Sequence, residues 1–164
     1  LWGYSIGDTV KFVSTNPYRV IVSGRIKHFI SAFGEHVIGE EVEKALRYAM
    51  ERHPGTEVVE FTVAPMVTPP EGGLPYHEWL IEFATPPQDP EAFANDLDRR
   101  LMELDLYYDD LITGNILRRL VITPLPKNAF IDHMRSQGKL GGQNKVPRLS
   151  NDRKIADSLR SLVK

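Results

Sequence analysis

Apolar residues recur along the chain with two spacings, one typical of strands and one typical of helices. Alternating or short apolar runs predict strands over 10–13, 18–22, 29–33, 59–63, 79–83 and 120–123. Apolar residues three and four positions apart predict helices over 38–52, 90–104, 127–136 and a last stretch that directs Ile155, Leu159 and Leu162 inward. The segment 105–115 is acidic and aromatic, and its pattern is compatible with either a short helix or irregular structure.

Turn and capping residues set the limits of these elements. Asn16-Pro17 separates the first two strands and indicates a β-hairpin. Asp89 before Pro90 predicts a helix start, because an Asp side chain accepts backbone N–H groups and Pro fits the first helical position. Ser150 or Asn151 is expected to cap the last helix.

The two central strands are expected to have one buried and one solvent face. The residues expected to point into the core are Val59, Phe61, Val63, Trp79, Ile81 and Phe83. Glu60, Thr62 and Glu82 lie between them and are expected to face outward.

The order of elements between residues 28 and 123 is β-α-β-β-α-β, the order of a ferredoxin-like split βαβ arrangement. We therefore predict an α+β fold: a ferredoxin-like split βαβ sheet with helices on one face, preceded by a β-hairpin and followed by C-terminal helices. No internal repeat is evident, and the pattern indicates one domain with a hairpin linker.

Composition narrows the class of protein. The 164 residues suffice for one sizeable domain. No apolar run reaches the roughly 18 residues of a membrane span, and the absence of Cys excludes disulfides and thiolate chemistry. The chain opens on Leu1 and lacks signal-peptide features, so we expect a fragment or processed chain from the cytoplasm.

Charge is divided unevenly along the chain. Residues 1–117 carry 9 Lys and Arg against 19 Asp and Glu, whereas residues 118–164 carry 11 against 3. A basic end of this kind could meet nucleic acid, a phosphate-bearing molecule or an acidic part of its own protein. A solvated face that neutralises the acidic part explains the asymmetry equally well.

Two segments near the start could hold a nucleotide. The carboxylate of Asp8, after Gly7, has two oxygens that could accept both ribose hydroxyls, although Gly-Asp is also common in simple turns. Gly24-Arg25 and Lys27 could form a hinge whose cations meet phosphate oxygens. The alternative is a charged strand edge that discourages aggregation.

Two further segments could bind an anion. Phe33-Gly34-Glu35-His36 opens the first long helix, where free N–H groups and His36 could contact phosphate; the alternative is a helix capped by Glu35. In the loop 141–148, two Gly allow close approach, and Lys145 could stabilise charge on a phosphate. A flexible basic surface loop is the alternative there.

Other nucleotide and metal motifs are missing from the sequence. It contains no Walker-type loop, no dinucleotide fingerprint and no His-Glu-x-x-His pair. The five His show no metal-ligand spacing, so we predict no metal site.

Taken in order, the segments 4–8, 24–25, 29–36 and 144–148 resemble the C-terminal portion of the Gretchen Hagen auxin-responsive family. These proteins are acyl-acid amido synthetases of the adenylate-forming superfamily, which includes firefly luciferase and acyl-CoA synthetases. The resemblance runs from Tyr4 to about Arg148, and it is the ordered series of segments that makes it specific.

The resemblance implies a parent enzyme that activates a carboxylic acid with ATP and Mg²⁺ and transfers the acyl group to an amine, usually of an amino acid. Residues 1–24 would be a hairpin and hinge from the large domain, and 25–164 a mobile closing domain that is inactive alone. ATP and Mg²⁺ would bind mainly to the large domain. The expected partners are the two substrates and the protein's own N-terminal domain, with no membrane, no nucleic acid and a monomeric state.

The resemblance also implies roles for single residues. Asp8 would hold the ribose hydroxyls, and Arg25 and Lys27 would lie in the hinge as cofactor contacts. Lys145 would contact phosphate in the closed state, with Arg148 beside it. His36 stands where relatives often carry Lys, and a neutral imidazole cannot replace an obligatory cation at pH 7.

Two other functions remain open from the residues alone. A non-catalytic ferredoxin-like module could bind RNA or protein through 118–164, although stacking aromatics are not evident, because Trp79 and Phe83 fit core positions better. A regulatory small-molecule sensor is the third possibility.

Overall fold

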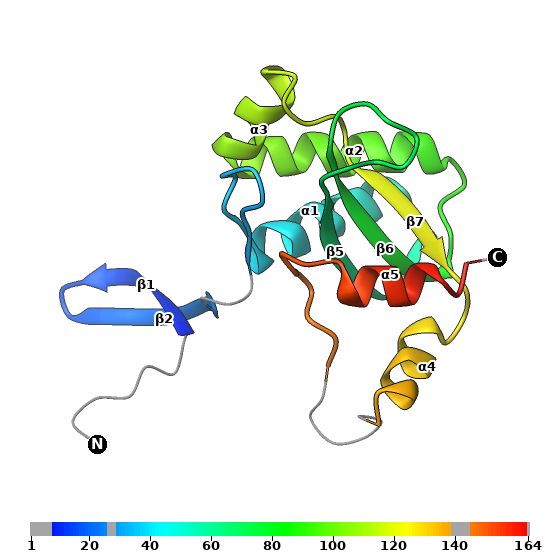
Figure 1. Cartoon of the computed structure of the whole chain (residues 1–164). Coiled ribbons are helices and arrows are strands. Elements are labelled where there is room, and N and C mark those ends of the chain that lie inside the picture. Colours follow the sequence, from blue (N-terminus) through cyan, green and yellow to red (C-terminus); the bar gives the residue numbers. More distant parts are fainter. Residues whose placement is uncertain (1–7, 26–28, 139–144, 164) are drawn as a thin grey trace.

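The computed structural model describes residues 8–25, 29–138 and 145–163, and a three-stranded sheet lies at its centre (Figure 1). Its strands are β5 (Glu57–Met66), β6 (Tyr76–Thr85) and β7 (Val121–Leu125), in the order β5-β6-β7. β5 and β6 are antiparallel. β7 runs parallel to β6, because the chain crosses back over two helices before it enters β7.

Helices cover both faces of this sheet. They are α1 (Gly39–Arg52), α2 (Pro90–Leu104) and α3 (Leu106–Thr113) on the first face, and α4 (Ala129–Ser136) and α5 (Lys154–Arg160) on the second. On the first face Leu46 and Leu97 pack with Trp79 in the larger core. On the second, Phe130 and Leu159 pack against Leu80. Of the two structures that the sequence left open for 105–115, the helix is present, as α3.

The predicted outward placement of Glu82 is wrong. Glu82 is 3% exposed, and Thr62, on the same face of the sheet, is 1% exposed. Glu82 Oε1 accepts the N–H of Asn128 at 2.7 Å, and its Oε2 accepts the N–H of Phe130 at 3.3 Å, at the start of α4. The alternating strand pattern predicted a solvent-exposed position there, because a local pattern carries no information about helices that follow later in the chain and pack on that face.

The other central strand departs from its predicted alternation at one end. Val59, expected inside, is 57% exposed. A register shift between Val58 and Glu60 alters the side-chain alternation where β5 begins. Beyond that shift Phe61 and Val63 are buried as predicted.

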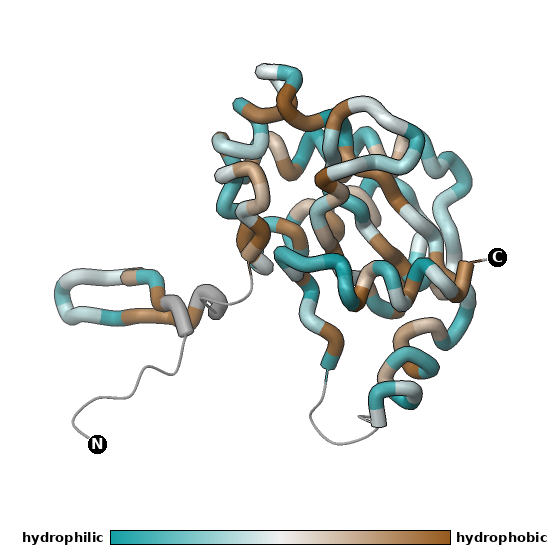
Figure 2. The backbone as a smooth tube through the Cα atoms, in the orientation of Figure 1, coloured by the Kyte–Doolittle hydropathy of each residue, from teal (hydrophilic) through white to brown (hydrophobic). Residues whose placement is uncertain are grey.

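The hairpin predicted around Asn16-Pro17 is present as β1 (Asp8–Thr15) and β2 (Tyr18–Arg25), and it stands apart from the central sheet (Figure 1). Figure 2 shows apolar stretches along it. Its exposed apolar side chains are Val10, Phe12, Val13, Tyr18, Val20, Ile21 and Val22. Such a two-stranded ribbon is marginally stable by itself.

The segment 29–33 contributes less to the sheet than its sequence predicts. It forms β3 (Phe29–Ile30), which pairs with β4 (Val37–Ile38) in a separate two-stranded ladder. Among the described strands β7 therefore adjoins β6 directly, where the split βαβ order places the first strand between them. The α+β class, the preceding hairpin and the C-terminal helices are confirmed.

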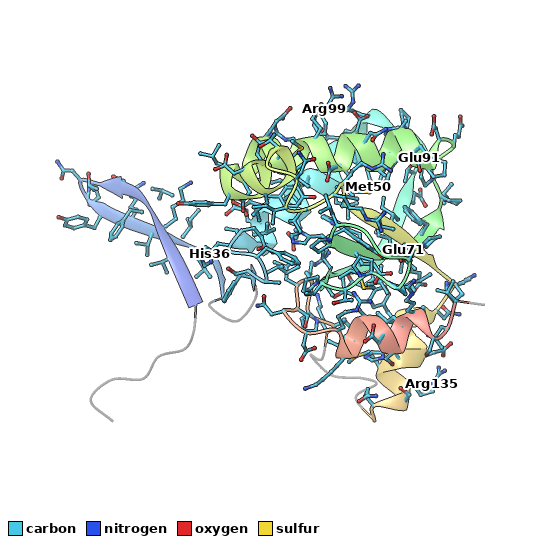
Figure 3. The ribbon with its side chains drawn as sticks, turned by 45° about the horizontal axis from the view of Figure 1, so that its top comes forward. His36, Met50, Glu71, Glu91, Arg99 and Arg135 are labelled. Carbon is cyan, nitrogen blue, oxygen red and sulfur yellow. The ribbon has the colours of Figure 1, made fainter. Side chains whose placement is uncertain are left out.

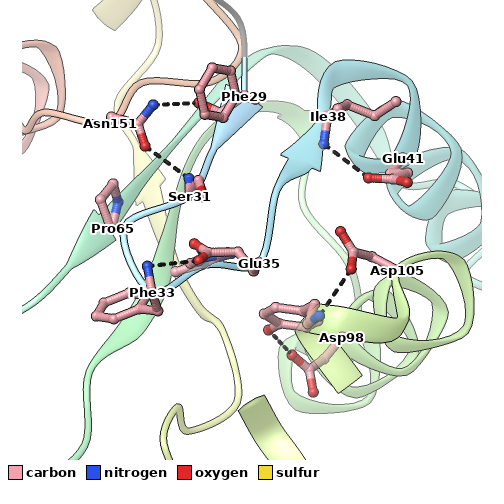
Figure 4. Close-up of polar contacts among 12 residues, drawn as sticks. Phe29, Ser31, Phe33, Glu35, Ile38, Glu41, Pro65, Asp98, Asp105 and Asn151 are labelled. Atoms are coloured by element: carbon pink, nitrogen blue, oxygen red, sulfur yellow. Dashed lines mark hydrogen bonds and ion pairs between the residues drawn. The ribbon is translucent and has the colours of Figure 1, made fainter. Parts of the chain in front are cut away.

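Neither Ser150 nor Asn151 caps the last helix, which begins at Lys154. Asn151 clamps β3 instead: its Oδ1 accepts the N–H of Ser31 at 2.9 Å, and its Nδ2 donates to the carbonyl of Phe29 at 2.7 Å (Figure 4). Leu162, expected to point inward, is 38% exposed.

Candidate functional site

A pocket of about 430 Å³ opens between α4, α5 and residues 145–147, and we call it the Lys145 pocket. Its lining residues are His133, Met134, Gln137, Lys145, Val146, Pro147, Lys154, Ile155 and Ser158. Two lysines therefore lie on its wall. Nδ1 of His133 lies 3.0 Å from Oγ of Ser158, so polar groups of both helices face each other here. Two ammonium groups beside an apolar floor suit an anion.

The segment that carries Lys145 is fixed by the edge of β5. Thr62 Oγ1 donates to the carbonyl of Pro147 at 2.7 Å, and the N–H of Val63 donates to the carbonyl of Arg148 at 2.9 Å. Val146 is 7% exposed and packs in the second core, whereas Lys145 is exposed. Within the described part of the chain no carboxylate pairs with Lys145.

Arg148, the predicted neighbour of Lys145 at a cofactor, is tied to the domain by three contacts. Its Nε lies 3.2 Å from Oε1 of Glu43, and its Nη1 lies 3.4 Å from Oε1 of Glu60. Its guanidinium also lies over the ring of Phe61, 4.6 Å from the centroid. These contacts join the segment 145–148 to α1 and β5, and a cofactor contact by Arg148 stays a prediction.

The loop 33–36 combines an exposed His36 with a buried Glu35. Gly34 and His36 have φ angles of 97° and 55°, both in the left-handed region. Glu35 is fully buried, and its Oε1 lies 2.8 Å from Nε2 of the equally buried His77. The ring of His36 lies 6.1 Å from that of Phe29.

Glu35 does not cap the helix that follows, so that alternative is wrong. The N–H of Ile38 donates to Oε2 of Glu41 at 2.9 Å, which makes Glu41 the carboxylate at the start of α1 (Figure 4). Burial is the main cause that raises the pKa of Glu41 to about 7, and the nearby charges of Asp105 and Glu40 add to it. The hydrogen bond from Ile38 acts in the opposite direction. Burial acts to raise the pKa of Glu35, but His77 and the backbone N–H groups of Glu35 and Phe33 together outweigh it, so the pKa of Glu35 lies below its ordinary value.

The remaining predicted site residues lie at the open end of the hairpin or beyond it. The backbones of Asp8 and Arg25 are opposite each other in the ladder, so the fold brings these two positions together. Their side chains, and the whole of Lys27, lie outside the described residues. Their roles at a nucleotide stay predictions.

The basic C-terminal third is largely neutralised by carboxylates. The pairs include Arg118–Glu71, Arg119–Glu91, Arg135–Asp132, Arg148–Glu60, Arg153–Glu78 and Arg160–Glu78. Most of these carboxylates lie before residue 118. The basic C-terminal third therefore pairs, within the fold, with the acidic part of the same chain.

The described residues hold neither a candidate metal site nor a helix that could span a membrane. Among residues 8–25, 29–138 and 145–163, no group of three His, Asp or Glu is placed to hold a metal ion. No helix in these ranges is long and apolar enough to cross a membrane.

Sequence reasoning missed the polar group behind the loop 33–36. His77 stacks on Tyr108, with ring centroids 5.1 Å apart, and the Tyr108 hydroxyl donates to Oδ1 of Asp98 at 2.6 Å. The one available signal was a His two residues before the predicted apolar strand 79–83. Nothing in the sequence pointed to Glu35 as its partner, 42 residues away.

Comparisons with known proteins agree on one family. The model of the GH3 family C-terminal domain matches residues 40–154. The fold matches a GH3.15 acyl acid amido synthetase with a TM-score of 0.75 and 18% identity, over 100% of this chain and 32% of that one. It matches the AtGH3.15 acyl acid amido synthetase in complex with 2,4-DB with a TM-score of 0.70 and 17% identity, over 97% and 30%.

These identities establish a shared fold, and this chain spans about a third of the length of either synthetase. No curated protein matches the sequence. The family model, however, covers most of the chain, including α1, the central sheet and the segment of Lys145. The resemblance seen in the ordered sequence segments is thereby confirmed: the chain belongs to the GH3 family and carries its C-terminal domain.

Proposed function

We propose that this chain is the mobile closing domain of an ATP-dependent acyl-acid amido synthetase, an acid–amino acid ligase. The parent enzyme would adenylate a carboxylic acid and pass the acyl group to the amine of an amino acid. The observation that carries the proposal is the match of residues 40–154 to the GH3 C-terminal domain. The acyl acid amido synthetase activity named for two structures of the same fold gives the reaction class.

The hairpin supports a division between two bodies. Its apolar side chains are exposed, and it forms a ladder separate from the central sheet. Such a hairpin is expected to be covered by a larger sheet in another domain. In this proposal residues 1–24 belong to the large domain of the parent, and 25–164 swing as the closing domain. Asp8 and Arg25, opposite each other in the hairpin, then mark the boundary.

Lys145 is the residue to which the proposal gives the charge-stabilising role. It is exposed, lies in a pocket with a second cation, Lys154, and has no carboxylate partner among the described residues. An ammonium group so placed fits a phosphate oxygen of ATP when the domain closes. Mg²⁺ and most of the nucleotide belong to the large domain in this scheme, in a monomeric cytoplasmic enzyme.

The alternative, an RNA-binding module built on 118–164, is less well supported. Stable nucleic-acid contacts need cations free to replace the counterions of phosphates. Here most of the arginines in that stretch face carboxylates of their own fold, among them Glu71, Glu78 and Glu91.

The test measures ATP–pyrophosphate exchange by the parent protein across a panel of carboxylic acids. At least one acid should support exchange, and hydroxylamine should trap its acyl group. Lys145→Ala should lower the exchange rate by about 100-fold, because it removes a cation aimed at developing charge. Lys127→Ala, an exposed lysine of the same basic stretch, should leave it within about twofold.

Two outcomes would contradict the proposal. Exchange with no acid in the panel would argue against the adenylating function. Equal rates for the Lys145→Ala and Lys127→Ala proteins would remove Lys145 from the mechanism. This chain alone, added to ATP and the active acid, should release no pyrophosphate, and release above the buffer rate would show that it is not merely a closing domain.

A further inference from the structure

The loop 33–36 has an unusual backbone conformation. Gly34 and His36 both adopt left-handed conformations, with φ of 97° and 55°. A residue with a Cβ rarely takes such a conformation unless its surroundings hold it there. His36 itself is exposed, so its own side chain is not packed in the core to impose it.

Glu35, between these two residues, is the anchor of the loop. Both of its carboxylate oxygens are engaged. Oε2 accepts the N–H of Phe33 at 2.8 Å (Figure 4), and Oε1 lies 2.8 Å from Nε2 of His77. Glu35 and His77 are each 0% exposed. A buried carboxylate without its partner is costly, so the Glu35–His77 contact fixes where the loop lies.

His77 is itself held in orientation. It belongs to β6, the central strand of the sheet, and its ring stacks on Tyr108. Tyr108 donates its hydroxyl hydrogen to Asp98, which also accepts the N–H of Leu120 at 3.1 Å. Nδ1 of His77 is buried with no hydrogen-bond partner, so the contact with Glu35 is the one hydrogen bond that its ring makes within the described fold.

We propose that His77 is a positioning residue: through Glu35 it fixes the loop 33–36 and sets where His36 stands on the surface. Figure 3 shows His36 on the side of the domain nearest the hairpin, well away from Arg135 on α4, one of the two helices that line the Lys145 pocket. His77 itself is too deeply buried to touch a substrate. Its importance for turnover rests on the proposed function, whereas its hold on the loop does not.

The first test uses this chain and needs no catalytic activity. His77→Leu leaves Glu35 without its partner, and His77→Gln keeps an N–H donor at similar reach. Amide hydrogen exchange followed by NMR should be at least about tenfold faster at Phe33 and its loop in the Leu variant, and near wild type in the Gln variant. Exchange in α1 and β6 should change much less.

A matched control separates this effect from general destabilisation. Leu159→Ala removes a buried side chain on the opposite face of the sheet and should destabilise the chain without selectively opening the loop. If His77→Leu does not fold, Glu35→Gln serves instead, because Gln keeps the size but loses the charge; it should accelerate exchange at Phe33 by about threefold. Unchanged loop exchange in the variant that folds, or an increase equal in all elements, would overturn the proposal.

The second test uses the parent enzyme. His77→Leu should lower kcat for amide formation at least about tenfold while the KM values for ATP and acid stay within about twofold, and His77→Gln should recover most of the rate. A Leu variant with an opened loop and unaltered kcat would confine His77 to a structural role. A wild-type parent that shows no synthetase activity would count against the proposed function, and the exchange experiment would still decide the positioning role.

Discussion

Arg153, at the start of α5, donates from Nη2 to Oε2 of Glu78 at 2.6 Å, and Glu78 is 1% exposed on the central strand β6. The other oxygen of Glu78 accepts the hydroxyl of Thr123 at 2.6 Å and lies 3.4 Å from Arg160. A carboxylate buried in the sheet thus ties the last helix to the fold. Because its desolvation is offset only while these partners are present, the cluster is sensitive to the loss of any one of them.

Arg153→Ala should lower the free energy of unfolding by about 3 kcal/mol, because it leaves Glu78 buried and less well paired. Urea denaturation of the chain measures this. Lys154→Ala is the matched control: its pair with Asp152 spans 3.6 Å and Lys154 is 88% exposed, so its loss should cost less than about 0.5 kcal/mol. Equal losses for the two variants would show that Arg153 does not hold α5.

Glu41→Gln should stabilise the chain at pH 8 and leave it nearly unchanged at pH 4. Burial raises the pKa of Glu41 from 4.5 to about 7 in the folded protein. For a carboxyl with a raised folded pKa, the penalty is absent below pH 4.5, grows between pH 4.5 and 7, and is complete above. Gln removes the charge, so the chain should gain stability at pH 8, by about 1 kcal/mol because Glu41 is only partly buried and solvent screens its charge.

Unfolding midpoints in urea at the two pH values check the Glu41 prediction. Glu51→Gln, on an exposed position of the same helix, should change stability by less than about 0.5 kcal/mol at either pH. A Glu41→Gln gain that is the same at pH 4 and pH 8 would mean that ionisation of Glu41 is not its cause.

Tyr108→Phe should destabilise the chain by about 1–3 kcal/mol at pH 7, because it removes the hydroxyl that donates to Asp98 and keeps the ring on His77. Burial already raises the pKa of Asp98, and the Tyr108 bond opposes that rise, so its loss should raise this pKa further. A double-mutant cycle with Asp98→Asn gives the coupling between the two side chains. Coupling below about 0.5 kcal/mol would show that the contact is not stabilising.

A single substitution of Arg148 separates a structural role of this side chain from a role at the cofactor. Arg148→Lys loses the planar stack on Phe61 and the fork that reaches Glu43 and Glu60, and should cost about 1 kcal/mol of stability. If its role is confined to these contacts, the KM of the parent for ATP should stay within about twofold. A tenfold rise in that KM, with the same loss of stability, would assign Arg148 to the nucleotide.

The sequence by itself determined the elements whose signals are local. Asp89 accepts the N–H of Ala92 at 3.0 Å and begins α2 as its capping pattern predicts. Asn16-Pro17 turns the hairpin, and the 3.6-residue period from Val42 to Ala49 forms the buried face of α1. Ile38, predicted on that face, is 36% exposed and lies in β4 before the helix. The ordered motifs also sufficed to indicate the GH3 family, because they are a property of sequence order.

Tertiary structure alone decided what the polar residues do. Glu78 and Glu82 are buried because α4 and α5, which follow much later in the chain, close over the second face of the sheet. Asn151 clamps β3 from 120 residues away, and Glu35 meets His77 across 42. A local pattern reports whether a residue can face a core, but the partner that makes a buried charge tolerable is set by packing between distant segments.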